Sequence, residues 1–183
     1  MKILFCASEC YPFFKSGGLG DVAYSLPRAL VKKGVDIRVI SPKYDDVPEF
    51  YKEKMELVAE FSVPVGWRQQ YVGLLHCELD GVHFYFIDNE YYFKRPGAYG
   101  YYDDGERYAY FSRAVIEAAN FIPDFTPDIF HCNDWQTALV PVYLRHFYHS
   151  DHMLSNAKSI FSIHNLLCLV VGGIQNMIPV CCL

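Results

Sequence analysis

The chain has 183 residues, of which 52% are hydrophobic and 20% charged, which suits one well-buried globular domain and argues against disorder. Its formal net charge of -5 offers no basic surface for a nucleic acid. The seven cysteines are odd in number and show no paired C-x-x-C spacing, so we expect free thiols in a reducing cytoplasm rather than disulfides or a zinc site.

The start of the chain predicts a strand, a glycine-rich loop, a helix and a second strand. Residues 2–7 (KILFCA) form an apolar run typical of a buried parallel strand, and the run is too short for the core of a signal peptide. From Asp21 the apolar residues have helical spacing, with a kink expected at Pro27 and a cap at Gly34. Residues 35–40 (VDIRVI) complete a βαβ unit.

The rest of the chain predicts a mixed insertion followed by further alternation of helices and strands. Asp80-Gly81 separates two runs rich in β-branched and aromatic residues, which is a hairpin signal, whereas residues 88–105 read as a loop. The remaining expected elements are strands at 58–65, 70–79 and 82–87, a long helix after Gly105, a strand in PDIFHC from Pro127, a helix from Trp135 to His146 and a strand in KSIFSIH from Lys158. Such alternation predicts a doubly wound α/β domain, whose ligand crevice lies at the carboxyl ends of the strands.

Three polar motifs fall at such strand ends. They are K-S-G-G-L-G-D from Lys15, H-C-N-D-W-Q from His131 and S-I-H-N from Ser162. Because the carboxyl ends of parallel strands meet at one edge of a sheet, we expect the three motifs to converge there.

The glycine loop has two readings. Gly17, Gly18 and Gly20 permit positive φ and close approach of the backbone, and the start of the following helix attracts a diphosphate. The spacing nevertheless matches neither G-x-x-x-x-G-K-[ST] nor G-x-G-x-x-G. Spacing alone therefore leaves a packing turn and a phosphate site both open.

The other two motifs differ in how strongly they indicate a ligand. For His131 we favour a structural role, in which neighbouring backbone groups satisfy the ring. Asp134 suits an N-cap of the helix at Trp135 without any chemistry, although a site role can coexist with that cap. His164 and Asn165 are better candidates, because two short polar groups at a strand end can bind sugar hydroxyls. The tyrosines of the 88–105 loop suit either sugar stacking or ordinary packing.

Four motifs in order resemble one known family. The sequence M-K-I-L-F-C-A-S-E-C-Y-P-F-F-K-S-G-G-L-G-D-V resembles the amino terminus of bacterial glycogen synthases and plant starch synthases. The similarity continues through G-Y-Y-D-D-G-E-R-Y-A-Y-F-S-R-A from Gly100, D-I-F-H-C-N-D-W-Q-T-A-L-V-P-V-Y-L from Asp128 and S-I-H-N-L from Ser162. It therefore covers residues 1 to about 166, and it implies a Rossmann-like domain that forms the amino-terminal half of a GT-B glycosyltransferase fold.

The resemblance also implies an activity and roles for individual residues. The reaction is transfer of glucose from ADP-glucose to the non-reducing end of an α-1,4-glucan, with retention of configuration and with neither a cofactor nor a metal. In the family the glycine loop contacts the donor, which implies donor-binding roles for Lys15, Gly17, Gly18 and Asp21. His164 is implied to lie against the transferred glucose and Asp134 near the sugar or the acceptor, and Asn165 is expected to bind substrate. Glu9 and Tyr92 are weaker candidates for substrate contacts.

The last 18 residues depart from the family pattern. Residues 166–183 contain no charged side chain, and three of the seven cysteines occur there. We expect an altered or out-of-frame ending and an absent carboxyl-terminal nucleotide-binding domain, rather than a membrane anchor, because glycine, proline and amide residues interrupt the apolar run. A chain without the second wall of the cleft is expected to be inactive alone. Two alternatives remain open, namely a non-catalytic glucan-binding fragment and a flavin-binding module of flavodoxin type.

Overall fold

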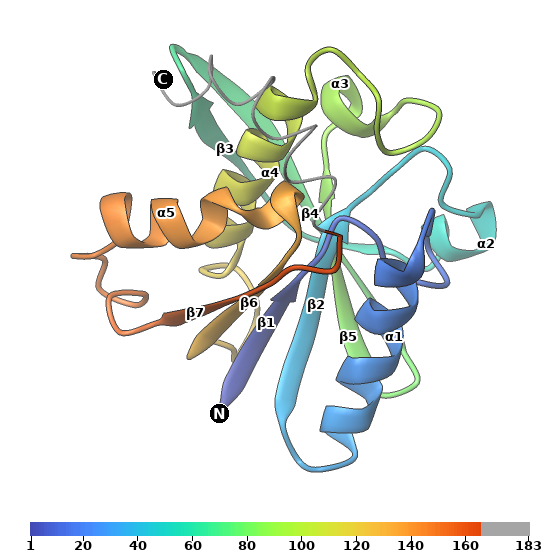
Figure 1. Ribbon diagram of the computed structural model, residues 1–183, viewed down its shortest axis with the longest axis horizontal. Coiled ribbons are helices and arrows are strands. Elements are labelled where there is room, and N and C mark those ends of the chain that lie inside the picture. Colours follow the sequence, from blue (N-terminus) through green and yellow to red (C-terminus); the bar gives the residue numbers. More distant parts are fainter. Residues whose placement is uncertain (166–183) are drawn as a thin grey trace.

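A seven-stranded mixed sheet with helices on both faces makes up the protein, whose computed structural model describes residues 1–165 (Figure 1). The strand order is β3-β4-β5-β2-β1-β6-β7, in which β5, β2, β1, β6 and β7 are parallel neighbours and β3 and β4 extend the sheet in antiparallel fashion. The strands are β1 (Lys2–Cys6), β2 (Asp36–Pro42), β3 (Glu56–Val65), β4 (Arg68–Leu79), β5 (Val82–Asp88), β6 (Ile129–Asn133) and β7 (Lys158–Ser162). The helices are α1 (Gly18–Val31), α2 (Glu49–Lys52), α3 (Glu90–Phe93), α4 (Asp104–Ala118), the 3-10 helix η1 (Trp135–Thr137) and α5 (Leu139–Phe147). The predicted doubly wound α/β fold is confirmed.

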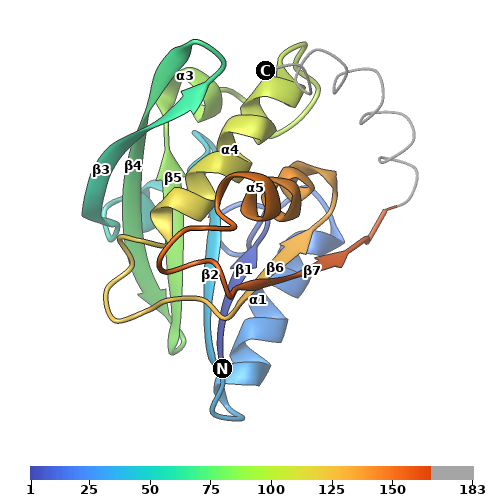
Figure 2. The ribbon, with the colours of Figure 1, turned by 90° about the vertical axis from the view of Figure 1, so that its left-hand side faces the viewer.

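Two apolar clusters, one on each face of the sheet, hold the layers together. Along the central strand β1, Leu4 and Cys6 belong to one cluster, whereas Ile3 and Phe5 belong to the other. Alternate residues of a strand point to opposite faces, so this division shows that β1 is covered on both sides. Helix α1 covers one face, and α4 and α5 cover the other (Figures 1 and 2).

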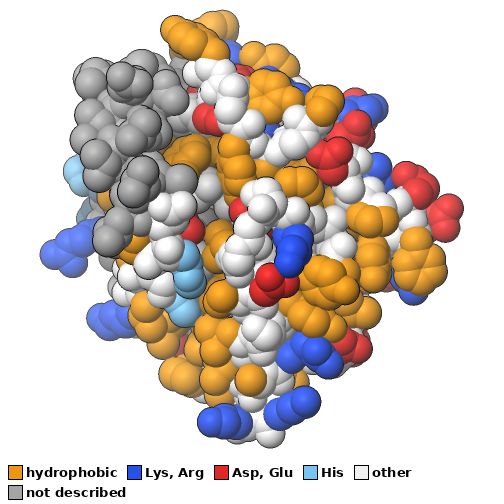
Figure 3. All heavy atoms as spheres, turned by 45° about the vertical axis from the view of Figure 1, so that its right-hand side comes forward, with side chains coloured by type: hydrophobic (Ala, Val, Ile, Leu, Met, Phe, Trp, Pro, Cys, Tyr) orange, Lys and Arg blue, Asp and Glu red, His pale blue; other side chains and the backbone are white. Residues whose placement is uncertain are grey.

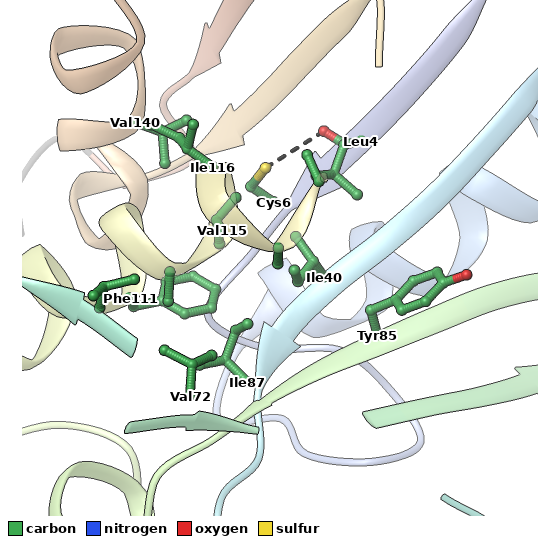
Figure 4. Packing of buried hydrophobic residues seen from close by; sticks show 14 of the residues in the cluster. Leu4, Cys6, Ile40, Val72, Tyr85, Ile87, Phe111, Val115, Ile116 and Val140 are labelled. Carbon is green, nitrogen blue, oxygen red and sulfur yellow. Dashed lines mark hydrogen bonds between the residues drawn. The ribbon is translucent and has the colours of Figure 1, made fainter. Parts of the chain in front are cut away.

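The larger cluster joins the helices α4 and α5 to the middle of the sheet. In Figure 4, Phe111 and Val115 of α4 and Val140 of α5 point toward Leu4 and Ile40 of the central strands. All five side chains are fully excluded from solvent, which contributes about 1.5–3 kcal/mol for each large apolar side chain. This packing holds α4 and α5 against the central strands β1 and β2.

The insertion is built as the sequence predicts. Asp80 and Gly81 have φ of 52° and 76°, and Leu79 pairs with Val82 across the turn. Positive φ at both central residues is the requirement of a tight type I′ hairpin, whose twist matches that of the strands. The prediction of a hairpin at Asp80-Gly81 is therefore confirmed.

The helix boundaries differ from the predictions in three places. Helix α1 begins at Gly18, three residues before the expected Asp21, although its end is as predicted, with Gly34 at φ 79° and the Gly34 amide donating to the Val31 carbonyl at 2.9 Å. The expected loop contains the short helix α3, and the Asn89 side chain caps it by accepting from the Tyr92 amide at 3.1 Å. The segment expected to be one helix from Trp135 is divided into η1 and α5.

The surface mixes both signs of charge, and Figure 3 shows basic and acidic side chains interspersed on one face. Within residues 1–165, no helix is both long and apolar enough to cross a membrane. The expectation of an altered ending at residues 166–183 lies outside the described residues.

Candidate functional site

A cavity of about 1160 Å³ opens at the carboxyl ends of β1, β6 and β7, where the three motifs converge. Its walls come from the segment between β1 and α1, the loop before α4, the turn between β6 and η1, and the residues that follow β7. Of the nine site residues that the sequence indicates, the cavity brings six together: Glu9, Gly17, Gly18, Asp134, His164 and Asn165. The predicted convergence at one edge of the sheet is therefore observed.

Glu9 braces the glycine loop. Its Oε2 accepts from the backbone amides of Ser16 at 2.5 Å and Gly17 at 3.0 Å, and its Oε1 accepts from the Ser16 hydroxyl at 3.0 Å. The Tyr99 hydroxyl donates to the same Oε1 at 2.9 Å, and burial raises the pKa of Tyr99, so that this hydroxyl stays protonated. Glu9 itself is 5% exposed. Because four donors already engage its carboxylate, Glu9 mainly shapes the cavity wall.

One of the two reasons expected for the loop glycines is wrong. None of Gly17, Gly18 and Gly20 has positive φ, whereas close approach of the backbone to a ligand stays a prediction. A Cβ at Gly20 would meet the Lys15 Cβ at 2.5 Å, which makes Gly20 necessary for the packing of the loop. A Cβ at Gly17 or Gly18 would meet no atom of residues 1–165 within 4 Å. Packing among these residues therefore requires no glycine at either position, and both glycines line the cavity.

The amino terminus of α1 faces the same cavity. Gly17 is the N-cap residue, and Gly18 and Leu19 begin the helix and line the cavity. The first amides of a helix have no partner inside the helix and lie at the positive end of its dipole. The 14-residue helix α1 therefore presents donors and partial positive charge to the cavity.

Lys15 and Asp21 do not line the cavity, although each is next in sequence to a residue that does, Ser16 and Val22, and they form an ion pair with each other. Lys15 Nζ donates to both carboxylate oxygens of Asp21 at 2.8 Å, and the side chains are 43% and 58% exposed. An exposed pair of this kind contributes little to stability. Lys15 can thus exchange Asp21 for another anion at small cost.

Asp134 joins the ends of β6 and β7. Its backbone amide donates to the Ser162 carbonyl at 2.9 Å, and its Oδ1 accepts from the amides of His164 at 2.6 Å and Asn165 at 3.3 Å. The expected side-chain cap of the following helix is wrong, because Asp134 makes no such bond there. Its φ of 58° and ψ of 178° lie in a region that is essentially restricted to glycine. The carboxylate orders the segment that carries His164.

His164 and His131 have different surroundings. His164 lines the cavity, and its Nε2 lies 2.9 Å from Asn133 Oδ1. His131 Nε2 lies 2.8 Å from the Ser162 hydroxyl, and its ring packs on Phe5 at 4.8 Å. Burial, with a smaller contribution from His164, lowers the pKa of His131. The structural role favoured for His131 agrees with these contacts, although its partner is a side chain rather than the backbone.

Tyr92 does not reach the cavity. It is fully buried, and its hydroxyl donates to Glu106 Oε1 at 2.7 Å. Tyr92 lies on α3, a helix that the sequence did not predict, and tertiary packing turns its ring inward against Tyr110. Of the other loop tyrosines, Tyr99, Tyr101 and Tyr102 line the cavity.

A buried ion pair shapes the loop that carries these tyrosines. Arg107 is fully buried and donates to Asp104 Oδ1 at 2.6 Å and to the Ala98 carbonyl at 2.9 Å. Asp104 Oδ2 accepts from the amides of Gly100 at 2.7 Å and Tyr101 at 3.2 Å. Sequence reasoning assigned no role to this pair. The i, i+3 spacing of Asp104 and Arg107 at the start of a helix was the available signal.

Comparisons with known proteins give a consistent picture. A family model described as the starch synthase catalytic domain matches residues 2–177. The glycogen synthases of Clostridium acetobutylicum and Clostridium novyi are 61% and 60% identical to this chain over 166 residues, which is 91% of this chain and 35% of each relative. This chain therefore spans about a third of the length of these relatives.

A solved structure agrees with this result. It is the catalytic domain of starch synthase IV from Arabidopsis thaliana bound to ADP and acarbose, with a TM-score of 0.79 and 32% sequence identity. The match covers 90% of this chain and 34% of that chain. With the family model matching nearly the whole sequence, the chain belongs to the starch synthase catalytic domain family.

Proposed function

We propose that the cavity is one wall of an ADP-glucose site and that the protein serves the transfer of glucose to the non-reducing end of an α-1,4-glucan with retention. The relatives are named glycogen synthases, and the solved relative is bound to ADP and acarbose. The proposal places the reaction in the cytoplasm, and the four described cysteines are buried free thiols.

The observation that carries the proposal is the open space over Gly17 and Gly18. A Cβ at either position would meet no atom of the described protein within 4 Å, yet both residues line the cavity. A ligand that approaches the backbone closely supplies the reason for glycine at these positions. A diphosphate suits the amino terminus of a helix, where backbone amides and the helix dipole attract anions.

In this proposal each part of the wall has one role. The free amides at the start of α1 hold the diphosphate as negative charge develops on it during departure. Lys15 releases Asp21 and neutralises the phosphates, and Asp21 keeps the ammonium near the loop until then. His164 lies against the transferred glucose with Asn165 beside it. Asp134 acts by ordering the backbone of these two residues.

The glucan is expected to use the aromatic side of the cavity. Tyr101 and Tyr102 line it, and Tyr102 is 99% exposed. Exposed aromatic rings offer flat apolar faces on which sugar rings can stack. We therefore assign the donor to the glycine-loop side and the acceptor to the side of the tyrosines.

Calorimetric titration of the 183-residue chain with ADP-glucose tests the donor site. We expect saturable binding that Gly17→Ala and Gly18→Ala each weaken by about tenfold or more, because a methyl group occupies space needed by the phosphates. The free energy of unfolding in urea should change by no more than about 0.5 kcal/mol in these two variants, since the new Cβ meets no atom of the part of the chain that the structure describes.

Gly20→Ala is the matched control. Its Cβ would meet the Lys15 Cβ, so this variant should lose stability, unlike the other two. Unchanged affinity for ADP-glucose in both Gly17→Ala and Gly18→Ala, or no binding at all by the parent chain, would contradict the proposal. Binding of maltohexaose that survives Lys15→Ala, without binding of ADP-glucose, would favour a non-catalytic glucan-binding role.

Turnover is a separate question from binding. Since the chain spans 35% of the length of its relatives, we expect the purified 183-residue chain to bind the donor without transferring glucose. Incorporation of labelled glucose from ADP-glucose into glycogen measures transfer directly. Sustained incorporation by the chain alone would show that the described wall suffices.

A further inference from the structure

Asn133 lies between the core and the cavity, and its side-chain amide has a fixed orientation. The residue is fully buried at the end of β6. Its Nδ2 donates to the carbonyl of Cys6 at 3.0 Å and to the carbonyl of His131 at 3.1 Å. Both partners can only accept, so a flipped amide would place three oxygens together in a buried space.

The orientation of this amide determines which ring nitrogen of His164 carries the proton. With Nδ2 directed at the two carbonyls, Asn133 Oδ1 is left to face His164 Nε2 at 2.9 Å. An amide oxygen can only accept, so Nε2 must carry the hydrogen. In neutral His164 the unprotonated nitrogen is then Nδ1, which has no hydrogen-bond partner among residues 1–165.

The neighbouring His131 has no contact that selects its tautomer among the described residues. Its Nε2 faces the Ser162 hydroxyl at 2.8 Å, and a hydroxyl can donate or accept. The contact therefore leaves the tautomer of His131 undetermined. Of the two histidines, the one that lines the cavity is the one whose tautomer a buried amide selects.

We propose that Asn133 is a positioning residue that holds His164 in the Nε2–H tautomer, so that the ring offers Nδ1 to the cavity as a hydrogen-bond acceptor. The backbone of His164 is fixed separately by Asp134, whose Oδ1 accepts from its amide at 2.6 Å. Ring and backbone are thus held by two consecutive residues of β6 and its turn. The acceptor suits a ligand hydroxyl, and the assignment of that hydroxyl to a sugar rests on the function proposed above.

The tautomer can be measured in the 183-residue chain labelled with 15N-histidine. Long-range 1H–15N correlation separates a protonated ring nitrogen from an unprotonated one, and loss of a signal in His164→Gln assigns the ring. We expect Nε2 of His164 to be protonated and Nδ1 unprotonated. Asn133→Leu keeps the size of the side chain but removes the acceptor. In this variant the 15N chemical shifts of both ring nitrogens of His164 should move toward the averaged values of a mixture of the two tautomers.

Ser162→Ala is the matched control. It removes the partner of His131 at the same end of β6 and β7 and leaves Asn133 in place, so the signals of His164 should not move. Protonation of Nδ1 in the parent chain, or an unchanged His164 spectrum in a folded Asn133→Leu, would overturn the proposal.

Asn133→Ala gives an independent test in case Asn133→Leu does not fold. The smaller side chain also removes the acceptor beside Nε2, and it places no apolar branch against the carbonyls of Cys6 and His131. The signals of both ring nitrogens of His164 should again shift toward averaged values. An unchanged His164 spectrum in this variant would contradict the contact between residues 133 and 164.

Binding of ADP-glucose separates the two parts of the inference. In a folded Asn133→Leu the affinity should fall about 3- to 10-fold, as expected for the loss of one well-placed hydrogen bond. A changed tautomer with unchanged affinity would overturn the role of Nδ1 as acceptor and leave the role of Asn133 standing. Absence of binding by the parent chain would refute the proposed function alone.

Discussion

At Asp134 a strained backbone and a buried carboxylate occur in one residue. With φ at 58° and ψ at 178°, the backbone costs about 1–3 kcal/mol for any residue other than glycine. The carboxylate offsets this cost through the amides of His164 and Asn165. We predict that Asp134→Ala is less stable than Asp134→Gly by about 1 kcal/mol, because both variants lose the carboxylate and only glycine relieves the strain.

Urea unfolding of the two variants measures this difference. Asp134→Asn is the companion variant, since its amide oxygen can still accept from both backbone amides, and it should be the most stable of the three. Equal stability of the alanine and glycine variants would show that the backbone conformation at this position costs nothing.

Glu9 gives a second prediction about a single residue. Its carboxylate accepts from two backbone amides, one hydroxyl of Ser16 and the hydroxyl of Tyr99. In Glu9→Gln one carboxylate oxygen becomes an NH2 group, which then faces hydrogen-bond donors and cannot accept from them. We expect a loss of about 1–3 kcal/mol in the free energy of unfolding.

Glu90→Gln is the control for this change. Glu90 also carries a negative charge with a nearby partner, Lys94 at 2.9 Å, but its side chain is 73% exposed. Its replacement should change stability by no more than about 0.5 kcal/mol. A Glu9→Gln variant as stable as Glu90→Gln would show that the hydrogen bonds between Glu9 and the glycine loop do not stabilise the fold.

At the level of elements, the hairpin of β4 and β5 makes a clear prediction. Gly81 has φ of 76°, and a Cβ there would meet no atom of the described residues within 4 Å. A substitution is therefore limited by backbone strain rather than by space. We expect Gly81→Ala to cost about 1 kcal/mol in unfolding free energy, and Gly81→Asn clearly less, because asparagine tolerates the left-handed region. Chemical denaturation of both variants tests the order, and equal losses would contradict it.

Elements with a strong local signal could be predicted from the sequence. The Asp80-Gly81 pair requires a tight turn, and the long apolar face of α4 requires a helix, so both were predicted in place. The start of α1 was placed three residues late, because glycines have no helical preference and contacts from Glu9 to the loop fix where the helix begins. The four-residue helix α3 depends on the cap at Asn89, a signal too short to outweigh the surrounding turn residues.

In the candidate site, too, some features could be predicted from the sequence and others depend on tertiary contacts. Motifs at the ends of parallel strands converge because of topology, which the alternation of elements predicts, and six of the nine indicated residues line one cavity. Tyr92 was indicated among several tyrosines of one loop, and no local pattern distinguishes a ring that packs inward from one that faces a ligand. Asn133 was missed because its role depends on carbonyls of Cys6 and His131, which the fold brings to its amide.

At the scale of the whole molecule, two partly buried histidines make stability depend on pH. Burial lowers the pKa of His131 on β6, and His164 lowers it further. Burial also lowers the pKa of His76 on β4, with a further contribution from His83. Both rings are held neutral in the folded protein more strongly than in the unfolded chain, whose histidines titrate near 6.5. Below that pH the unfolded state binds more protons, so acid favours unfolding.

We therefore predict that the free energy of unfolding falls as the pH is lowered from 7 to 5 and stays nearly constant from 7 to 8. His131→Gln and His76→Gln should each reduce the slope below pH 6.5, because each removes one group that takes up a proton on unfolding. His152→Gln, at an exposed position, should leave the slope as it is. Urea unfolding at half-unit steps of pH measures all four proteins. A slope in that window that neither substitution reduces would show that groups other than these histidines cause the acid destabilisation, and the carboxylates, which titrate at lower pH, would be examined next.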